Sequence, residues 1–215
     1  DQALVMATQT LVRAGGGQAG SVELDPAVFE APVKPHLFHA EVRRQLAEKV
    51  DLREVAHLEQ LAVFSEPHRV PDARVIASAF LGLVPSPASP ALPSDTRWHP
   101  VRELPPMAFD HAPMVAYAHS RLAAKLSYTN IGFALAPKEF ALSTLRDIYG
   151  AALGYQVDAT NLQRVLGRRG VISPTGTTVH PGRSGGRPAA LYRFTGSRLR
   201  VTDEFAALSP PSVPR

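Results

Sequence analysis

The sequence contains no cysteine among its 215 residues. Disulfide bridges, thiolate metal sites and a cysteine nucleophile are therefore excluded, and any metal would need histidine or carboxylate ligands. No apolar run approaches the roughly 18 residues that a membrane-spanning helix requires, and no basic and then apolar leader stands at the start. These absences predict a soluble protein with no membrane partner, and the cytoplasm is its expected compartment.

Lysine is also scarce. Four of the 23 basic residues are lysines, so the other 19 are arginines, and proline is abundant with 20 residues. This bias is typical of a GC-rich bacterial genome.

Positive charge is scarce in the first part of the chain and concentrated in the second. Residues 1–124 carry 11 basic and 14 acidic side chains, whereas residues 125–215 carry 12 basic and five acidic ones. The net charge is thus −3 before Lys125 and +7 from Lys125 onward. Such segregation predicts a nucleic-acid-binding module joined to a domain with a different task. Charge alone leaves open a basic surface that is merely solvated.

The first part of the chain has the hydrophobic patterns of strands and helices in alternation. The glycines do not indicate a phosphate-binding loop, because no Lys-Ser/Thr pair and no amphipathic helix follow them. The predicted elements are a strand at 4–12, a glycine turn at 15–17 with Gly20, a loop at 25–35, a helix from Leu37 to about Val50, an antiparallel strand pair at 57–64 and 74–84, a loop at 85–93, a short strand at 98–101, and a helix capped by Asp110 that ends near Leu126.

Beyond Leu126 the pattern predicts a small helical domain that ends in a β-hairpin. A first helix is predicted after Pro137, with a capping hydroxyl at Ser143 or Thr144 and an end at Gly150 and Gly154. A second helix is capped by Asp158 or Thr160 and ended by Gly167 and Gly170. Strands from Val171 and at 190–194 enclose a tip at 174–188, and a frayed tail follows at 210–215. Helix, turn, helix and then a hairpin with a basic tip is the order of a winged helix-turn-helix, whose second helix enters the DNA major groove.

The second helix carries side chains suited to reading DNA. If Leu162, Val165 and Leu166 face the core, then polar and basic residues remain outside, and Asn, Gln and Arg can form bidentate hydrogen bonds with adenine or guanine. Basic residues at the helix end and in the hairpin are expected to neutralise phosphates. An exposed arginine-bearing helix that is only solvated is the alternative. The predicted DNA-binding residues are Thr160, Asn161, Gln163, Arg164, Arg168, Arg169, Arg183, Arg187 and Arg193.

Long ordered motifs between His57 and Phe194 resemble the Nudix-related transcriptional regulators (NrtR type). The motifs are His57-Leu-Glu-Gln-Leu61 with Arg74-Val-Ile76, Trp98-His-Pro-Val101 through Leu104-Pro-Pro-Met-Ala-Phe-Asp-His111, Lys125-Leu-Ser-Tyr-Thr129, Phe140-Ala-Leu-Ser-Thr-Leu145, and Gly185-Gly-Arg-Pro-Ala-Ala-Leu-Tyr-Arg-Phe194. The resemblance implies an α+β protein: a Nudix-like α/β/α sandwich with a mixed sheet at 1–124, a winged helix-turn-helix domain at 125–200 and a tail at 201–215.

The same resemblance implies the function. The expected protein is a homodimeric DNA-binding transcription regulator, a repressor in our interpretation, that binds a palindromic operator and controls genes of NAD or related cofactor metabolism. ADP-ribose or a related nucleotide is the expected effector, and no cofactor is required. A protein-interaction module in place of a DNA-binding one stays an alternative.

The resemblance also places a catalytic Nudix signature on the helix that follows Leu37, but this sequence keeps only part of it. With Arg44 on the signature arginine, Glu48 falls on a matching glutamate, whereas Gln45 and Lys49 replace two others, Asp51 replaces a glycine, and Glu30 and His36 stand where the upstream Gly and Glu belong. Magnesium needs carboxylates and waters, so hydrolysis and a metal site are not expected.

Arg44 and Glu48 remain the candidate effector-binding residues. A zinc site at His36 and His39 is disfavoured because no third ligand accompanies them. An active hydrolase of ADP-ribose-like nucleotides is the alternative function.

Overall fold

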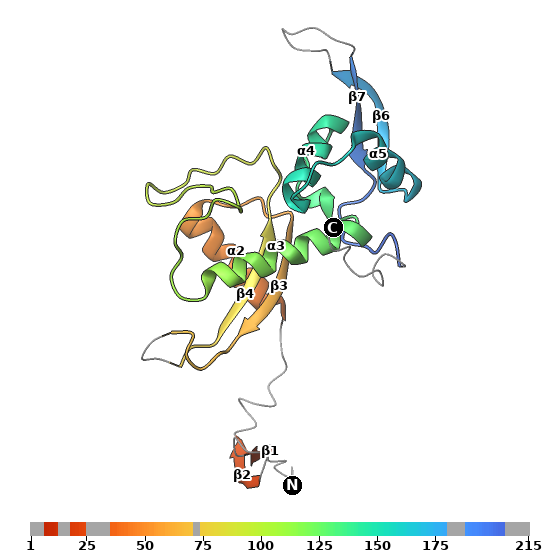
Figure 1. The fold of residues 1–215 in the computed structure, drawn as a ribbon. Helices are drawn as coiled ribbons and strands as arrows, with labels where there is room; N and C mark the ends of the chain where they lie inside the picture. Colours follow the sequence, from red (N-terminus) through yellow and green to blue (C-terminus); the bar gives the residue numbers. More distant parts are fainter. Residues whose placement is uncertain (1–6, 13–17, 25–34, 71–73, 180–187, 205–215) are drawn as a thin grey trace, which may run out of the picture. The chain divides into compact units, whose positions relative to one another are not determined.

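The computed structural model describes residues 7–12, 18–24, 35–70, 74–179 and 188–204 (Figure 1). The chain divides into two compact units, residues 1–41 and 42–215. The first unit contains the antiparallel hairpin of β1 (Ala7–Val12) and β2 (Gln18–Leu24). Gly20 was expected in a turn, but it lies within β2 opposite Leu11, and glycines 15–17 lie outside the described residues.

A helix and a hairpin open the second unit. The predicted helix is α2 (Pro35–Val50), whose residues fall in both units. The predicted strand pair is confirmed as β3 (His57–Phe64) and β4 (Ala77–Leu83), which are antiparallel with a register shift between Gln60 and Ala62. Helix α3 (His111–Tyr128) crosses this hairpin and leads to the remaining elements (Figure 1).

Two local predictions in this part were wrong. Residues 98–101 form no strand: residues 98–100 have no regular structure, and a turn begins at Val101, where Glu103 N donates to Pro100 O. Trp98 is 61% exposed, and a proline cannot donate to a strand ladder. Asp110 occupies the position before α3 but makes no side-chain cap, because its two carboxylate oxygens accept hydrogen bonds from Arg69 at 2.8 and 2.9 Å.

The rest of the second unit is helix, turn, helix and hairpin, as predicted. It contains the 3₁₀ turn η1 (Ile131–Ala134), β5 (Phe140–Ala141), α4 (Leu142–Leu153), α5 (Ala159–Arg168), β6 (Ile172–Val179) and β7 (Ala189–Phe194). The three strands form an antiparallel sheet in the order β5-β7-β6. This is the winged helix-turn-helix arrangement, with β6 and β7 as the wing.

Three details of this domain differ from the prediction. Neither Ser143 nor Thr144 caps α4, which begins directly after the short strand β5 without a side-chain cap. Gly150 and Gly167 lie inside helices, whereas Gly154 (φ 82°) and Gly170 (φ 63°) follow the helix ends in the left-handed conformation that glycine favours. Strand β6 extends to Val179, so residues 174–179 of the predicted tip are strand, and residues 180–187 of that tip lie outside the described residues.

One hydrophobic core joins the two halves of the second unit. Ile131, Leu145, Leu166 and Val171 are at most 2% exposed and come from η1, α4, α5 and the segment before β6. Leu83 at the end of β4 belongs to the same cluster and is 4% exposed. Burial of these side chains therefore couples the hairpin β3–β4 to the helical domain.

Packing around Gly132 gives the first prediction. A Cβ at this position would stand 2.8 Å from the Tyr149 hydroxyl and 3.0 Å from Phe194 Cζ, whereas a Cβ at Gly167 would meet nothing within 4 Å. We expect Gly132→Ala to lower the free energy of unfolding by about 1–3 kcal/mol through overpacking. The control Gly167→Ala should raise it by up to about 1 kcal/mol because alanine favours the helix. Denaturant unfolding measures both, and equal values for the two variants would contradict the packing.

Candidate nucleic-acid interface

Helix α5 separates its apolar and polar side chains. Leu162 and Leu166 are buried and Val165 is half-buried, while Asn161, Arg164 and Arg168 are exposed. The Arg164 guanidinium donates a hydrogen bond to Asn161 Oδ1 at 2.7 Å, so these two side chains form one polar surface. Thr160 is also exposed at the start of the helix.

The beginning of α5 is set by Asp158. Its side chain accepts a hydrogen bond from the Asn161 backbone N–H at 2.6 Å, which satisfies one of the free donors in the first helical turn. This confirms one of the two caps that the sequence proposed.

Two other predicted DNA-binding residues, one in α5 and one at its C-terminal cap, have partners within the protein. Gln163 is half-buried and donates to the Tyr192 hydroxyl of β7 at 2.8 Å. Arg169, whose side chain is 18% exposed, donates to Ser127 O at 2.7 Å and pairs with Asp203 at 2.5 Å. Arg169 thereby joins the end of α5 to the end of α3.

The structure describes strands β6 and β7 of the wing. Arg193 is exposed on β7 opposite Ser173, and it lines a cleft of about 770 Å³ together with Lys138 and Phe133. Arg183 and Arg187 lie outside the described residues.

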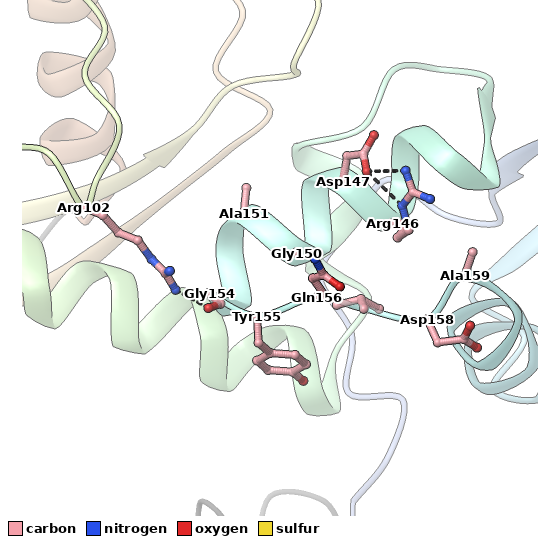
Figure 2. Close-up of a pocket in the computed structure, with 11 residues that line it drawn as sticks. Arg102, Arg146, Asp147, Gly150, Ala151, Gly154, Tyr155, Gln156, Asp158 and Ala159 are labelled. Carbon is pink, nitrogen blue, oxygen red and sulfur yellow. Dashed lines mark hydrogen bonds and ion pairs between the residues drawn. The ribbon is translucent and has the colours of Figure 1, made fainter. Parts of the chain in front are cut away.

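A second cleft, of about 740 Å³, lies at the turn between α4 and α5, and the sequence did not single out its residues (Figure 2). Tyr155, 64% exposed, and Gln156 stand in this turn beside the start of α5. Arg102, from the loop before α3, reaches the same turn and donates to the Gly154 carbonyl (Figure 2). The position of an aromatic residue between two predicted helices was the signal that could have found this cleft.

Arg44 and Glu48, the candidate effector-binding residues, lie on an exposed face of α2 and pair with each other at 2.5 Å. A Nudix magnesium site would need several carboxylates here, and the neighbouring exposed residues are Gln45 and Lys49. The described residues contain no group of three His, Asp or Glu that could hold a metal ion. The residues present therefore do not fit the Nudix metal.

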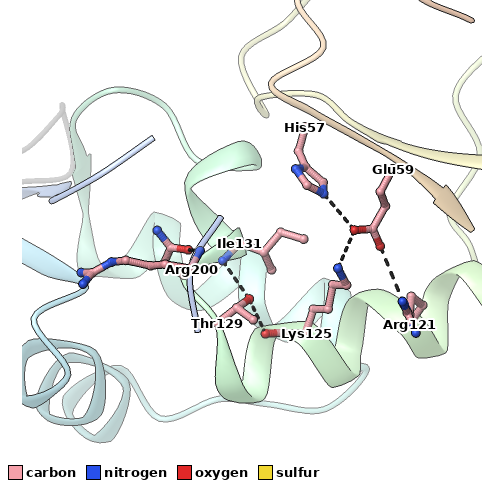
Figure 3. Close-up of polar contacts among 8 residues, drawn as sticks. His57, Glu59, Arg121, Lys125, Thr129, Ile131 and Arg200 are labelled. Carbon is pink, nitrogen blue, oxygen red and sulfur yellow. Dashed lines mark hydrogen bonds and ion pairs between the residues drawn. The ribbon is translucent and has the colours of Figure 1, made fainter. Parts of the chain in front are cut away.

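A cluster of charged side chains lies between β3 and α3 (Figure 3). Glu59 Oε2 accepts from Lys125 Nζ at 2.5 Å and contacts His57 Nε2 at 3.0 Å, while Arg121 Nε lies 3.8 Å from Oε1. Burial, the largest influence, acts to raise the pKa of Glu59, but the hydrogen bonds from Lys125 and His57 together lower this pKa below its usual value. Glu59 is therefore ionised at neutral pH.

Comparison with known proteins bears on the helical domain first. Residues 132–194 match the family model described as the NrtR DNA-binding winged helix domain. These residues are therefore similar to the winged helix domain of NrtR-type proteins. Searched across its described residues, the chain contains no helix long and apolar enough to cross a membrane.

Relatives of the NrtR type are also similar outside this domain. The chain is 35% identical over 88 residues to the ADPR responsive transcriptional repressor NtrR of Acinetobacter baylyi, and this match covers 41% of the chain and 34% of the relative. The part of the chain that matches therefore spans about a third of the length of that curated relative.

Solved structures extend the likeness to most of the chain. NrtR of Shewanella oneidensis matches with a TM-score of 0.62 at 26% identity, and its complex with a 27mer DNA with a TM-score of 0.63 at 23% identity; each match covers 83% of this chain and 79% of that one. A MutT/nudix family protein from Enterococcus faecalis matches with a TM-score of 0.56 at 19% identity over 73% of this chain and 69% of its own. The expected resemblance to NrtR-type regulators and the α+β fold class are thus confirmed.

The cap of α5 yields a prediction for the NrtR-type domain. Asp158→Ala should lower the free energy of unfolding by about 1 kcal/mol, because the Asn161 N–H loses its acceptor. Asp158→Asn keeps an acceptor oxygen and should stay close to the wild type. Thermal unfolding of the full chain tests this, and an Asn variant as unstable as the Ala variant would show that the cap is not the cause.

Proposed function

We propose that this protein is a homodimeric transcription repressor that binds a palindromic DNA operator through its winged helix domain. The observation that carries the proposal is the exposed polar face of α5 within a domain that matches the NrtR DNA-binding family. Two domains related by a two-fold axis would read half-sites about one or two DNA turns apart. Such a regulator acts in the cytoplasm, where bacterial DNA lies.

The predicted DNA-binding residues have two kinds of proposed role. Asn161 and Arg164 read base edges in the major groove, and Arg168, Arg193 and the wing residues Arg183 and Arg187 contact phosphates. Arg169 and Gln163, which have protein partners, position α5. The proposal includes a Nudix-like domain at 1–124, a winged helix domain at 125–200 and a tail from residue 201.

We further infer that the Nudix-like part senses a nucleotide without hydrolysing it. The A. baylyi relative is named as ADPR responsive, which makes ADP-ribose the first effector to test. The incomplete carboxylate set around Glu48 supports a role without catalysis. Genes of NAD metabolism are the proposed targets.

A base contact and a phosphate contact can be distinguished by comparing binding to the operator with binding to random DNA. Arg164→Ala should reduce binding to the operator more than binding to random DNA, by about 1–3 kcal/mol, because a base contact is lost. Arg183→Ala should weaken binding to both DNAs and reduce the salt slope by about one, because a phosphate contact is lost. Fluorescence anisotropy at several salt concentrations measures both, with Lys49→Ala as the charge-matched control. Equal losses on both DNAs for Arg164→Ala would remove its base-reading role.

The effector is tested by gel shift on DNA from upstream of the protein's own gene and its neighbours, with and without ADP-ribose. A sensor must bind ADP-ribose with different affinity in its DNA-bound and free states. The protein concentration that gives half-maximal DNA binding should therefore change by about 5-fold or more when ADP-ribose is added. The same samples with magnesium should release no phosphate-containing product beyond a no-protein control. Magnesium-dependent cleavage of ADP-ribose would instead support the hydrolase alternative.

A further inference from the structure

The carboxylate of Glu59 is held between strand β3 and helix α3. The side chains of Glu59 and Lys125 are 15% and 10% exposed, and their charged atoms lie 2.5 Å apart. Glu59 Oε1 is buried and has no hydrogen-bond partner among the described residues; the Arg121 guanidinium is 3.8 Å away. The negative charge of Glu59 is compensated by the positive charge of Lys125, because a buried charge that loses its partner strongly destabilises the fold.

Lys125 is connected to the winged helix domain through its own backbone. Its carbonyl accepts from Thr129 N at 2.9 Å and from Thr129 Oγ1 at 2.7 Å. The same hydroxyl accepts from Ile131 N at 3.2 Å, and Ile131 is fully buried in the core of the domain (Figure 3). A displacement of Lys125 along the axis of α3 would therefore move the start of the domain.

From this point a second set of bonds reaches the end of α5. The Asn130 side chain donates to Arg198 O at 2.9 Å and accepts from Arg200 N at 2.8 Å. The Arg200 guanidinium donates to Gly170 O at 2.9 Å, directly after α5. Arg169 adds a direct bond from the end of α5 to Ser127 O on α3.

We propose that Glu59 and Lys125 are a positioning pair that sets the orientation of α5 relative to the hairpin β3–β4, and thereby the DNA affinity. The pair touches no DNA; it fixes α3 to the hairpin at the helix end from which the winged helix domain continues. A shift of β3 relative to α3 therefore reaches the DNA-reading helix through this contact. The proposal rests on the proposed DNA-binding function.

The test is a double-mutant cycle in the full chain: Glu59→Gln, Lys125→Gln and the double variant, with Lys125→Arg as the conservative variant. Glu66→Gln is the matched control, because it removes the same charge from an exposed position in the loop after β3. The readouts are operator affinity at several salt concentrations, thermal unfolding, and amide hydrogen exchange of residues 165–171.

We expect Glu59→Gln to weaken operator binding roughly tenfold, a typical size for coupling between sites. The salt slope should stay unchanged because no phosphate contact is lost. The double variant should bind no more weakly than the weaker single variant, since the pair acts as a unit. Lys125→Arg should retain most of the affinity, Glu66→Gln all of it, and residues 165–171 should exchange faster in Glu59→Gln.

A lowered melting temperature with operator affinity and exchange at 165–171 equal to those of Glu66→Gln would overturn the proposal and leave a purely structural pair. Additive losses in the double variant would overturn it as well. Should the wild-type chain bind no DNA, the proposed function fails, and exchange at 165–171 still decides whether the pair positions α5.

Discussion

A carboxylate cannot be buried at low cost without a compensating charge, and Glu59 meets this requirement through residues of another element, α3. The pairing with Lys125 fixes which turn of α3 faces β3. Leu83 extends the same attachment into the helical core, where apolar burial is not directional and cannot set a register by itself. Apolar and ionic contacts therefore contribute differently at this junction. The core holds the hairpin β3–β4 and the helical domain together, and the ion pair sets their relative orientation.

This division of tasks suits a regulator. A winged helix that reads a palindrome must present α5 at a defined angle, because its base contacts depend on geometry more strongly than its phosphate contacts do. In the proposed function the exposed arginines supply attraction that is tolerant of small displacements. Arg169 differs from them, since its guanidinium bonds to Ser127 and Asp203 and holds the helix end in place. The basic residues of this domain thus separate into exposed ones, which are the proposed DNA contacts, and one that positions the helix.

The sequence predicted the elements whose signal is local and regular. Strand β3 was predicted with its exact bounds, and the cap at Asp158 was identified, because alternation and capping depend on neighbouring residues. Predictions failed where distant residues compete for a side chain. Asp110 has the sequence of a cap, but Arg69, 41 residues earlier, binds both of its oxygens. Gln163 was expected on the outer face of α5 and Arg169 among the phosphate contacts; their protein partners lie on β7 and beyond it, which no local pattern shows.

The proposed function gives the first part of the chain a sensing role in place of a hydrolytic one. Hydrolysis of a diphosphate needs carboxylates to hold magnesium at one position, and on α2 Glu48 is paired with Arg44 beside Lys49. Sensing has a weaker requirement: a ligand must favour one of two arrangements of the protein. Among the described residues, the hairpin β3–β4 is joined to α3 by the Glu59 ion pairs and to the helical domain by a shared core. A difference of a few kcal/mol between two arrangements of the hairpin would be enough to change DNA affinity substantially. An incomplete set of metal ligands is therefore compatible with the proposed regulation, because the proposed coupling depends on the contact between β3 and α3 and needs no metal.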